Sequence, residues 1–511
     1  MAFLYFIFTF TCSLLFLLLF LFSFLMLRIF AGKSIRHPNY PPVKGTTFDH
    51  LLYYNKLYDY HTRVAREGPT HRLLSLNSSM IYTCDPRNIE HFLKTNFAHY
   101  SKSDYNKTIM SEILGQGIFV VNGEKWKQQR KLASYEFSTR NLRDFSCSVF
   151  RGNAAKLVKF LSEFSNSKRV FDMQELLMRC TLDSIFKVGF GTELNCLEGL
   201  SKDGIAFMKA FDESAALTYW RYVDPFWKLK RFLNIGSEAT LKQYVKVTHD
   251  FVHQLIRNKR ELLAAKRDGI SDKEDILSRF LMESEKDPVG MNDDYLSDII
   301  LNFMIAGKDT SANTLSWFFY MLSKNPLIQG KVAQEVRDVV GMNHDSDIDE
   351  FVRNITDANL EKMHYLHATL TETLRLYPAV PVDGRYAEKD DILPDGFRVK
   401  KGDRIAYMAY AMGRMPYVWG EDAEVFRPER WLDNGVFKPE SPFKFIAFHA
   451  GPRTCLGRDF AYRQMKIVAM ALLCFFRFKL ADETRNVTYR TMFTLHIDGT
   501  LPMLALPRKT S

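Results

Sequence analysis

The sequence predicts a mainly α-helical protein with a minor β region, preceded by one N-terminal transmembrane helix. Residues 2–27 carry no charged side chain. Helical periodicity dominates from residue 48 to about residue 324, and a strand-like pattern with turn signals covers residues 396–410. The 511 residues are 46% hydrophobic and 25% charged, which is the composition of a globular protein with a large core and excludes a disordered chain.

The N-terminal apolar run is long enough to cross a bilayer. A helix over residues 2–27 extends about 39 Å, against a hydrocarbon core of about 30 Å. A cleaved signal peptide usually has a shorter apolar region that follows positive charge, and no Lys or Arg precedes this run. Basic residues follow it at Arg28, Lys33, Arg36 and Lys44, so the positive-inside rule places the rest of the chain in the cytosol.

We expect three segments: a transmembrane anchor over residues 2–27, a basic, proline-rich linker over residues 28–47, and a large domain over residues 48–511. The seven cysteines are scattered and form no CxxC pair, which excludes a disulfide scaffold and favours a cytosol-facing domain. The net charge of +10 suits a membrane surface or an acidic protein partner. No nucleic-acid-binding motif is present, so we expect no nucleic-acid partner.

A long buried helix is expected in the middle of the chain. Asn292 or Asp293 can cap its start, and Asn325-Pro326 stops it after Lys324. A solvated, charged connection is expected before it, over residues 266–294. Other helices are expected over residues 327–340 and 360–376 and after residue 457, with short strands over residues 71–76 and 80–83.

The segment with the clearest chemistry is FHAGPRTCLG, residues 448–457. Gly451 and Pro452 favour a tight turn, and Cys455 follows just before a helix start. Backbone N–H groups and a helix N-terminus stabilise a thiolate at such a place. A thiolate can bind haem iron, and Arg453 can pair with a haem propionate. The alternative is a buried structural cysteine.

This segment matches FxxGxRxCxG, the haem-binding signature of the cytochrome P450 family, at all five specified residues, and the chain resembles that family. The resemblance implies the cytochrome P450 fold for residues 48–511, as a haem-binding catalytic domain. It implies haem b as cofactor, with Cys455 as the metal ligand. Cofactor-binding positions that it implies are Phe448, Arg453, Gly457, Trp126, Arg130, Arg385 and Ala306.

Two of these positions have an independent pattern. Trp126 and Arg130 are four residues apart and share a helix face, as in the family's WxxxR motif, whose members contact a haem propionate. Arg385 lies ten residues after Arg375, where family members often place another propionate partner. For Arg130 and for Arg385, the alternative is an ordinary surface arginine.

The segment Ala306-Gly307-Lys308-Asp309-Thr310 lies in the middle of the long helix and resembles the family's oxygen-activation motif, (A/G)Gx(D/E)T. Small side chains at Ala306 and Gly307 let a ligand approach the backbone. Asp309 and Thr310 are the predicted catalytic residues, because a carboxyl and a hydroxyl can relay protons to dioxygen.

A structural triad is also implied. Glu372 and Arg375 match the family's ExxR motif, and Arg430 lies in PERW, which resembles the family's PERF-type motif with Trp431 in place of Phe. On its own, an i,i+3 ion pair is usually solvated and contributes little. The resemblance assigns the three charged residues to architecture rather than to chemistry.

The activity implied is insertion of one oxygen atom from O2 into a C–H bond, while the other atom becomes water. Electrons come from NADPH through a separate NADPH-cytochrome P450 reductase, since no dinucleotide fingerprint is present. We expect a single-pass protein of the endoplasmic reticulum membrane with a cytosolic catalytic domain. Basic residues expected to attract the reductase are Lys125, Lys127, Lys131, Arg458, Arg463 and Lys466.

The substrate is inferred from similarity. Residues 306–326 and 381–396 are most similar to plant fatty-acid ω-hydroxylases, which implies ω- or in-chain hydroxylation of a long-chain fatty acid. A sterol or terpenoid substrate is the alternative within the same chemistry. Positions expected to line an apolar substrate pocket are Ile118, Phe119, Val120, Phe303, Met304, Val380, Val382, Met492 and Phe493.

Two other functions stay open: a peroxide-rearranging enzyme, which needs neither Asp309 nor Thr310, and a non-catalytic haem-binding membrane protein.

Residues 219–222 and 225–232 interleave aromatic and basic side chains, which suits a membrane interface and also suits amphipathic core helices.

Overall fold

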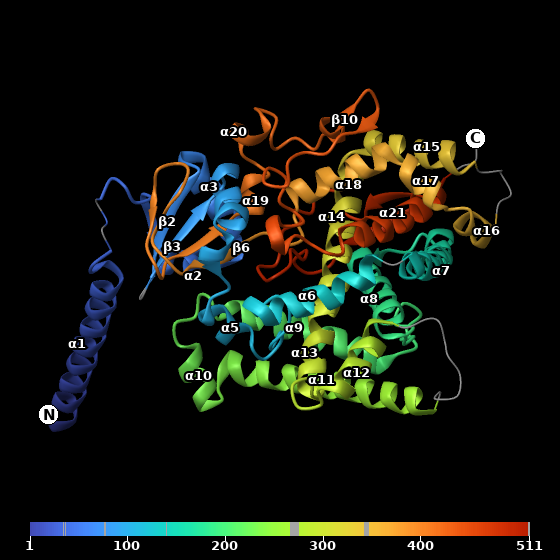
Figure 1. The fold of residues 1–511 in the computed structure, drawn as a ribbon. Helices are drawn as coiled ribbons and strands as arrows, with labels where there is room; N and C mark the ends of the chain where they lie inside the picture. Colours follow the sequence, from blue (N-terminus) through green and yellow to red (C-terminus); the bar gives the residue numbers. More distant parts are fainter. Residues whose placement is uncertain are drawn as a thin grey trace. The chain divides into compact units, whose positions relative to one another are not determined.

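The computed structural model describes residues 1–33, 35, 37–75, 78–138, 140–265, 275–341 and 347–508. Arg36 of the predicted linker, Leu76 of a predicted strand and residues 266–274 of the charged connection lie outside these ranges. The chain forms two compact units. The sheet unit comprises residues 1–101 and 382–412, and the helical unit comprises residues 102–381 and 413–511 (Figure 1).

The sheet unit begins with α1 (Ala2–Phe30), which is three residues longer than the predicted anchor. This helix is long and apolar enough to cross a membrane, and none of its most apolar stretch is buried by the protein. Within a water-soluble fold such a surface is rare, because large exposed apolar patches mark contact with lipid or another protein. The charge-free sequence therefore forms the helix that was expected of it.

A six-stranded sheet organises the rest of this unit, in the order β1-β2-β3-β9-β6-β4. The β2–β3, β6–β9 and β4–β6 pairs are antiparallel, and the β1–β2 and β3–β9 pairs are parallel. The strands are β1 (Val43–Thr46), β2 (Thr70–Leu74), β3 (Ser79–Thr83), β4 (Tyr100–Ser101), β6 (Asp383–Ala387) and β9 (Arg404–Tyr407), with a separate pair β7 (Asp391–Ile392) and β8 (Arg398–Val399). The helices are α2 (Thr47–Leu52), α3 (Leu57–Glu67), α4 (Pro86–Glu90) and α19 (Ala409–Met412).

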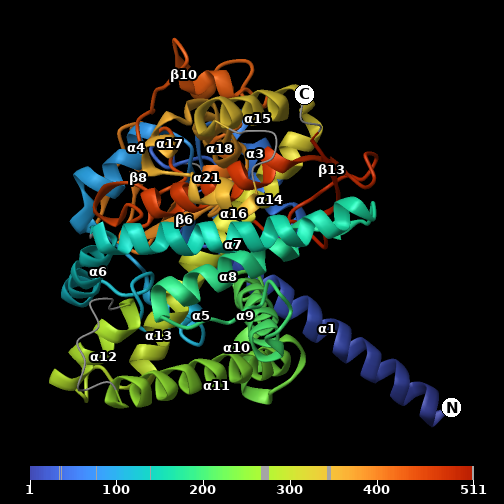
Figure 2. The same cartoon turned by 90° about the vertical axis from the view of Figure 1, so that its right-hand side faces the viewer.

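The helical unit carries most of the helices. Figure 2 shows α7 crossing the front of this unit, where it packs against α8 and α21. Its longer helices are α6 (Gly123–Ser138), α7 (Arg140–Asn166), α8 (Met173–Phe190), α9 (Lys202–Trp220), α11 (Gly236–Ala265), α12 (Ile276–Lys286), α13 (Asp293–Met304), α14 (Thr310–Lys324), α15 (Pro326–Val340), α18 (His364–Leu376) and α21 (Arg458–Phe475). Shorter ones are α5 (Asp104–Met110), α10 (Trp227–Leu233), α16 (Ile348–Arg353), α17 (Asp357–Lys362) and α20 (Pro416–Trp419).

Two small sheets complete the helical unit. One has the order β12-β13-β5, and the other pairs β10 with β11. The strands are β5 (Phe171–Asp172), β10 (Leu432–Asp433), β11 (Val436–Phe437), β12 (Phe476–Leu480) and β13 (Pro502–Pro507). Helices therefore dominate and strands are the minor component, as the sequence predicted.

The predicted long helix is present, with one irregularity. The Asn292 side chain accepts a hydrogen bond from the Tyr295 N–H at the start, and the helix ends before Asn325. Its middle, η4 (Ile305–Asp309), is a π-helical turn between α13 and α14. Single π-turns inside α-helices are frequent at functional sites, and this one contains the predicted oxygen-activation motif up to Asp309.

The helix predicted over residues 360–376 is interrupted. Met363 has a ψ of 74°, which ends α17 and precedes α18. Met363 itself is fully buried, so packing of its side chain accompanies the break in the backbone. Hydrophobic periodicity alone does not reveal such a break, because both helices present apolar residues to the same core.

Candidate functional site

Cys455 lies in a tight loop that its own backbone holds together. The 3-10 turn η6 (Gly451–Arg453) precedes it, and Gly451 has a φ of 68°, which favours glycine. The Cys455 N–H donates to the Phe448 carbonyl at 2.8 Å. Helix α21 begins three residues after the cysteine, so the loop presents the sulfur next to a helix N-terminus.

Helix α6 brings Trp126 and Arg130 to this loop. Arg130 Nη2 donates to the Thr454 carbonyl at 2.9 Å, and the Arg453 guanidinium lies 4.5 Å from the centre of the Trp126 ring. Arg453 Nη2 also donates to the Val121 carbonyl at 2.7 Å. Two guanidinium groups and an indole ring therefore lie together at the cysteine loop, and guanidinium groups suit the binding of an anionic group.

The Cys455 thiol was expected to ionise readily beside the helix N-terminus, and its surroundings have the opposite effect. Burial raises the pKa of the Cys455 thiol, although the Gly457 N–H and the charges of Arg130 and Arg458 oppose this. The helix N-terminus therefore does not produce a thiolate by itself, because desolvation outweighs it. A bound metal ion deprotonates a coordinating thiol outright.

The residues around the loop fit a haem. Cys455 keeps exposed surface while the surrounding protein desolvates its sulfur. A sulfur that is both accessible and desolvated is what an iron ligand beside a buried macrocycle needs, and thiolate is a known haem ligand. Arg130 and Arg453 are the cations that would face propionates. Gly457 leaves room, since a side chain there would meet only Phe137, at 3.7 Å.

Arg385 and Val382 belong to the sheet unit, whereas the other predicted site residues belong to the helical unit. Arg385 is buried in β6, and its Nη1 donates to Asp383 at 2.7 Å. Its Nε has no hydrogen-bond partner among the described residues. A buried guanidinium N–H without a partner has bonding capacity left for an anionic ligand.

The oxygen-activation motif lies on the π-turn η4. The Thr310 hydroxyl donates to the Ala306 carbonyl at 2.5 Å, within the helix. Gly307 has a different role from the expected one: a Cβ there would lie 2.6 Å from Ile185 of α8. The absence of a side chain at Gly307 thus permits close packing of two helices, and Ala306 alone remains as the small residue for a ligand.

Asp309 is fully buried and surrounded by polar groups. Its Oδ1 lies 2.7 Å from Lys308 Nζ, and its Oδ2 accepts a hydrogen bond from the Thr494 hydroxyl at 3.3 Å. Lys308 also pairs with Asp212 of α9. The sequence reasoning missed Lys308, Asp212 and His496, because the last two lie far from the motif in the chain and carry no motif of their own.

The three residues of the predicted structural triad meet in the helical unit. Arg375 binds Glu372 through two bonds of 2.7 Å, and Arg430 Nε lies 3.5 Å from Glu372. The Trp431 indole donates to Glu372 at 2.9 Å. The departure from the family's Phe at position 431 therefore adds a hydrogen bond to the carboxylate.

The predicted pocket residues are spread over several elements. Met304, Val120 and Met492 are buried, and Phe119 is 40% exposed. Phe303 packs toward Phe137 and Phe280, with ring centroids 6.4 and 6.3 Å away. Ile118 uses its carbonyl to accept from Arg453, and Val380 and Phe493 are half-buried. Tyr219 of α9, which was not among the predicted pocket residues, lies 5.2 Å from the Phe493 ring.

The proposed membrane-facing segments divide into a buried part and an exposed part. Tyr219 and Arg221 are buried, and Arg221 pairs with Glu238 at 2.7 Å, so residues 219–222 belong to the core. Trp227 is also buried, beneath the Arg221 guanidinium at 4.6 Å. The exposed apolar residues lie on and around α10: Phe226, Leu229, Phe232, Leu233 and Ile235.

One residue predicted to lie on the basic surface that attracts the reductase is not at the surface. Lys466 is buried, and its Nζ donates to the Leu360 carbonyl at 2.7 Å. Burial lowers the pKa of Lys466 to about 8. It therefore cannot attract a protein partner, whereas Lys127 and Lys131 are exposed on α6.

A cysteine loop flanked by two arginines, and a long helix with a buried carboxyl and a hydroxyl at a π-turn, are features that suit the class of haem-thiolate oxygenases. The sequence profile of the family named Cytochrome P450 matches residues 38–501. The chain belongs to the cytochrome P450 family and is a monooxygenase of that family.

Curated relatives match over most of their length. Cytochrome P450 704C1 of Pinus taeda is 49% identical over 92% of this chain and 93% of its own. Cytochrome P450 704B1 of Arabidopsis thaliana is 43% identical over 89% of this chain and 91% of its own. Cytochrome P450 86B1 of the same plant is 39% identical over 86% and 78%. Membership implies a haem, a redox partner and a lipophilic substrate.

Proposed function

We propose that the chain is a membrane-anchored haem-thiolate hydroxylase of long-chain fatty acids, in which Cys455 would hold the iron of haem b. The observation that carries this proposal is the arrangement of Cys455 beside Arg453, Arg130 and Trp126. Thiolate ligation supplies the electron density that favours O–O cleavage when haem is bound.

The chain's own residues have distinct tasks in this proposal. Arg130 and Arg453 would bind the propionates of the haem, while Phe448 and Gly457 shape the loop that carries Cys455. Asp309, at the end of the π-turn, and Thr310, the first residue of α14, would hold and move protons for the reaction. Glu372, Arg375 and Arg430 hold the loop-bearing core in place.

The fatty-acid substrate rests on two supports. Residues 306–326 and 381–396 resemble plant fatty-acid ω-hydroxylases. The proposed pocket positions are apolar, and Tyr219 with Phe493 adds an aromatic wall, as an alkyl chain needs. Such positions suit a sterol or terpenoid equally, so the substrate class is the part that a product assay must decide.

The proposed location rests on the apolar N-terminal helix. The proposed electron supply rests on the family, whose members receive electrons from a redox partner. Helix α1 anchors the protein in the endoplasmic reticulum membrane, with the catalytic domain in the cytosol. NADPH-cytochrome P450 reductase supplies the electrons.

Ligation is tested with Cys455→Ser. The reduced, carbon-monoxide-treated variant should lose the absorption band of thiolate-bound ferrous haem, whereas Cys474→Ser, another buried cysteine of the same unit, should keep it. If the Cys455→Ser protein retains this band, Cys455 is not the iron ligand and the proposed function is wrong.

The substrate class is tested in microsomes that contain the protein and the reductase. A panel of fatty acids, sterols and terpenoids is supplied with NADPH, and products are identified by mass spectrometry. Hydroxylated fatty acids are expected. Turnover of sterols or terpenoids alone overturns the substrate and leaves the haem chemistry intact, while NADPH-independent turnover identifies a peroxide-rearranging enzyme.

A further inference from the structure

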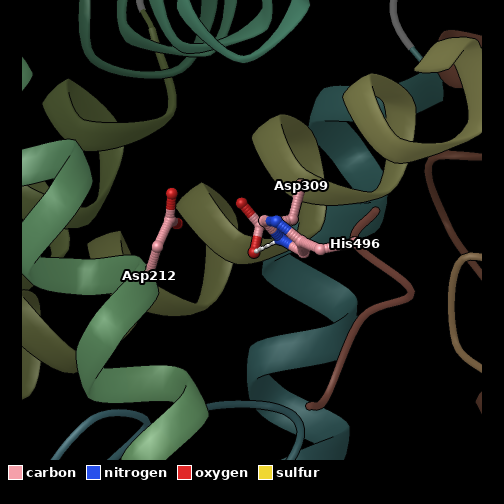
Figure 3. A group of neighbouring side chains, drawn as sticks. All are labelled: Asp212, Asp309 and His496. Atoms are coloured by element: carbon pink, nitrogen blue, oxygen red, sulfur yellow. Dashed lines mark ion pairs between the residues drawn. The ribbon is translucent and has the colours of Figure 1, made fainter. Parts of the chain in front are cut away.

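The long central helix carries two groups of polar side chains that contact other parts of the helical unit. One group lies at the π-turn, where Asp309 faces His496 and Asp212 lies on the neighbouring helix (Figure 3). The other group lies about two turns earlier, in α13, where Asp298 and Asn302 are one turn apart. This second group contacts the segment that joins α5 to α6.

The group at the π-turn is a network of paired charges rather than a metal site. Asp212, Asp309 and His496 each offer a ligand atom within 4.8 Å of the others, but the Lys308 ammonium pairs with both carboxylates. A divalent cation would meet this ammonium at close range, where like charges in a desolvated interior repel strongly. Burial raises the pKa of Asp212, whereas Lys308 and His496 outweigh burial at Asp309 and lower its pKa.

The segment that joins α5 to α6, residues 111–122, is a series of turns without a helix or a strand. It contains Ile118, Phe119 and Val120, three of the positions predicted to line the substrate pocket. We call residues 111–122 the wall segment. Because no helix or sheet holds its shape, the place of its side chains depends on hydrogen bonds from neighbouring elements.

Asn302 holds the wall segment with both polar atoms of its amide. Its Nδ2 donates to the Leu114 carbonyl at 2.9 Å, and its Oδ1 accepts from the Phe119 N–H at 3.4 Å. The same Nδ2 donates to the Asp298 carbonyl at 2.7 Å, within α13. Asn302 is 1% exposed, so water does not compete for these bonds. One buried side chain therefore binds both sides of the turn at Gly117.

Two further side chains hold the peptide groups of Gln116. The Asp298 carboxylate accepts from the Gln116 N–H at 2.8 Å, and Gln129 Nε2 of α6 donates to the Gln116 carbonyl at 2.8 Å. Gln129 is buried, and its Nε2 also donates to the Tyr295 hydroxyl of α13 at 3.1 Å. The backbone of the wall segment is thus fixed between α13 and α6.

Two glycines of the wall segment leave room for the side chains of α13. A Cβ at Gly115 would overlap the Asp298 carboxylate, and a Cβ at Gly117 would overlap the Asn302 amide. Gly115 also has a φ of 46°, which favours glycine. The overlap at Gly117 could be relieved only by moving Asn302 out of its hydrogen bonds. Each glycine is therefore matched to one polar side chain of α13.

The wall segment also contacts the cysteine loop. Arg453 donates to the Ile118 carbonyl at 3.3 Å and to the Val121 carbonyl at 2.7 Å. Phe303, the residue after Asn302, is another predicted pocket position. The bonds of Asn302 therefore fix two sets of predicted pocket side chains relative to each other, one on the wall segment and one on the central helix.

We propose that Asn302 is a positioning residue that fixes the wall segment and thereby selects the carbon atom of the substrate at which oxygen is inserted. This inference rests on the proposed hydroxylase function and on the predicted pocket positions. An alkyl chain makes few directional contacts of its own, so the place of the wall decides which C–H bond lies nearest the reacting oxygen. A misplacement of about 1 Å can change a rate by about a hundredfold, which is enough to change the main product.

The decisive variant is Asn302→Leu in the full-length, haem-loaded protein with its reductase, because leucine has a similar volume and binds neither backbone group. With a long-chain fatty acid as substrate, the share of the wild type's main positional isomer should fall by about half or more, well within the effect of a misplaced substrate. Isomers hydroxylated at neighbouring carbons should appear in its place, and mass spectrometry of the products measures the distribution. The carbon-monoxide band of thiolate-bound ferrous haem should be unchanged.

A second variant reaches the same bonds from the other side. Gly117→Ala displaces the Asn302 amide without removing it, and should shift the product distribution in the same direction as Asn302→Leu. A wild-type distribution in both variants overturns the proposal.

The matched control is Asn313→Leu, the same change at another fully buried asparagine of the long helix. Neither polar atom of the Asn313 amide has a hydrogen-bond partner among the described residues. Asn313→Leu should keep the wild-type product distribution, and its melting temperature should not fall, because an unsatisfied buried amide costs free energy. Equal shifts of the distribution in Asn302→Leu and Asn313→Leu overturn the assignment to Asn302.

A further measurement needs no turnover. Melting temperatures of the haem-loaded wild type, Gly117→Ala, Asn302→Ala and the double variant form a cycle. Gly117→Ala should lower the melting temperature less when Asn302 is already alanine, since the added methyl group then finds space. Additive effects show that the two residues do not meet in the folded protein, and they overturn the contact on which the proposal depends.

Failure of the proposed function looks different. The carbon-monoxide band of Cys455→Ser and the product panel report on haem ligation and substrate class, whatever Asn302 does. If the wild type turns over only a sterol or terpenoid, the positional isomers of that product are compared, and Asn302→Leu against Asn313→Leu decides the proposal in the same way.

Discussion

Glu372 is a fully buried carboxylate with several hydrogen-bond partners. Its carboxylate binds Arg375 and Arg430, and it accepts from the Trp431 indole and the Arg427 N–H. Arg375 in turn donates to the carbonyls of two loop residues, Ala423 and Val425. The pair thus cross-links α18 to the loops that follow α20.

Removing one partner of this pair leaves an uncompensated buried charge. Glu372→Ala should lower the free energy of unfolding by about 3–5 kcal/mol, the usual cost of breaking a buried ion pair. Urea unfolding of the haem-loaded protein, followed by circular dichroism, measures this. Asp250→Ala, which breaks an exposed pair with Lys246 on α11, should remain close to wild type; equal losses in both would refute the structural role.

At the scale of elements, α10 and the residue before it present a group of large, exposed apolar side chains. Phe232 is 85% exposed, and Leu229 and Phe226 are exposed by more than half. Lys228, Lys230 and Arg231 are interleaved with them. Aromatic residues beside basic ones suit the headgroup region of a bilayer, because each kind of side chain finds its own solvent there.

Phe232→Glu and Leu229→Glu together should weaken the binding of a protein lacking residues 1–30 to liposomes with anionic lipid. The family profile begins at residue 38, so this truncation spares the matched domain. Flotation of liposomes measures binding, and Leu327→Glu, an exposed apolar residue at the start of α15, is the control. Equal flotation of all three proteins would exclude α10 as a membrane contact.

At the scale of the whole molecule, the sheet unit contains a buried stack of histidines. His50 Nε2 lies 3.0 Å from His61 Nε2, and the His71 ring stacks on that of His61 at 5.8 Å. Neither nitrogen of His71 has a hydrogen-bond partner among the described residues. Burial lowers the pKa of His50 to about 3 and that of His71 to about 4.

This stack should make stability depend on pH. A histidine with a lowered pKa stays neutral in the folded protein, while the unfolded chain binds protons below its ordinary pKa of 6.5. Stability is therefore full above pH 6.5 and falls as the pH drops toward 4. For His71 alone the loss reaches about 3 kcal/mol at most.

His71→Leu should reduce that dependence, because leucine fills the site and does not titrate. Melting temperatures between pH 7.5 and pH 5 measure it, with His253→Leu as the partly exposed control on α11. A slope in His71→Leu as steep as in wild type would show that the stack does not set the pH response.

The exposed lysines of α6 are expected to bind the reductase. Lys127→Glu with Lys131→Glu should raise the reductase concentration needed for half-maximal turnover several-fold, because charge reversal slows association with an acidic surface. Titration of the reductase at two salt concentrations measures this. Lys246→Glu, on α11, is the control, and an unchanged requirement in the α6 variant rejects this docking face.

Several features could be predicted because they depend on local sequence. The uncharged run of residues 2–27, the cap at Asn292 and the stop at Asn325-Pro326 each act on neighbouring backbone, and the observed helices follow them. The grouping of Cys455 with Trp126 and Arg130 came from recognised motifs. The local sequence of the two segments does not by itself predict that they lie side by side in the fold.

Other features escaped prediction because they depend on distant partners. Lys466 was expected at a surface and is buried, and Trp227, in a segment that suited either a membrane interface or the core, is buried too. Amphipathic side chains look alike in a sequence whether they snorkel or pack. Gly307 was expected to admit a ligand and instead admits Ile185. The break at Met363 arises where two helices share one core.

The sequence by itself determined the chemistry available to this protein: a cysteine before a helix, a carboxyl and a hydroxyl in a long apolar helix, and an anchor without charge. These are properties of composition and short spacing. Only the tertiary structure decided which charges face each other without water, because the partners of Lys308 come from α9 and from its own π-turn, and the desolvation that gives them contrasting proton affinities exists only once the helices pack.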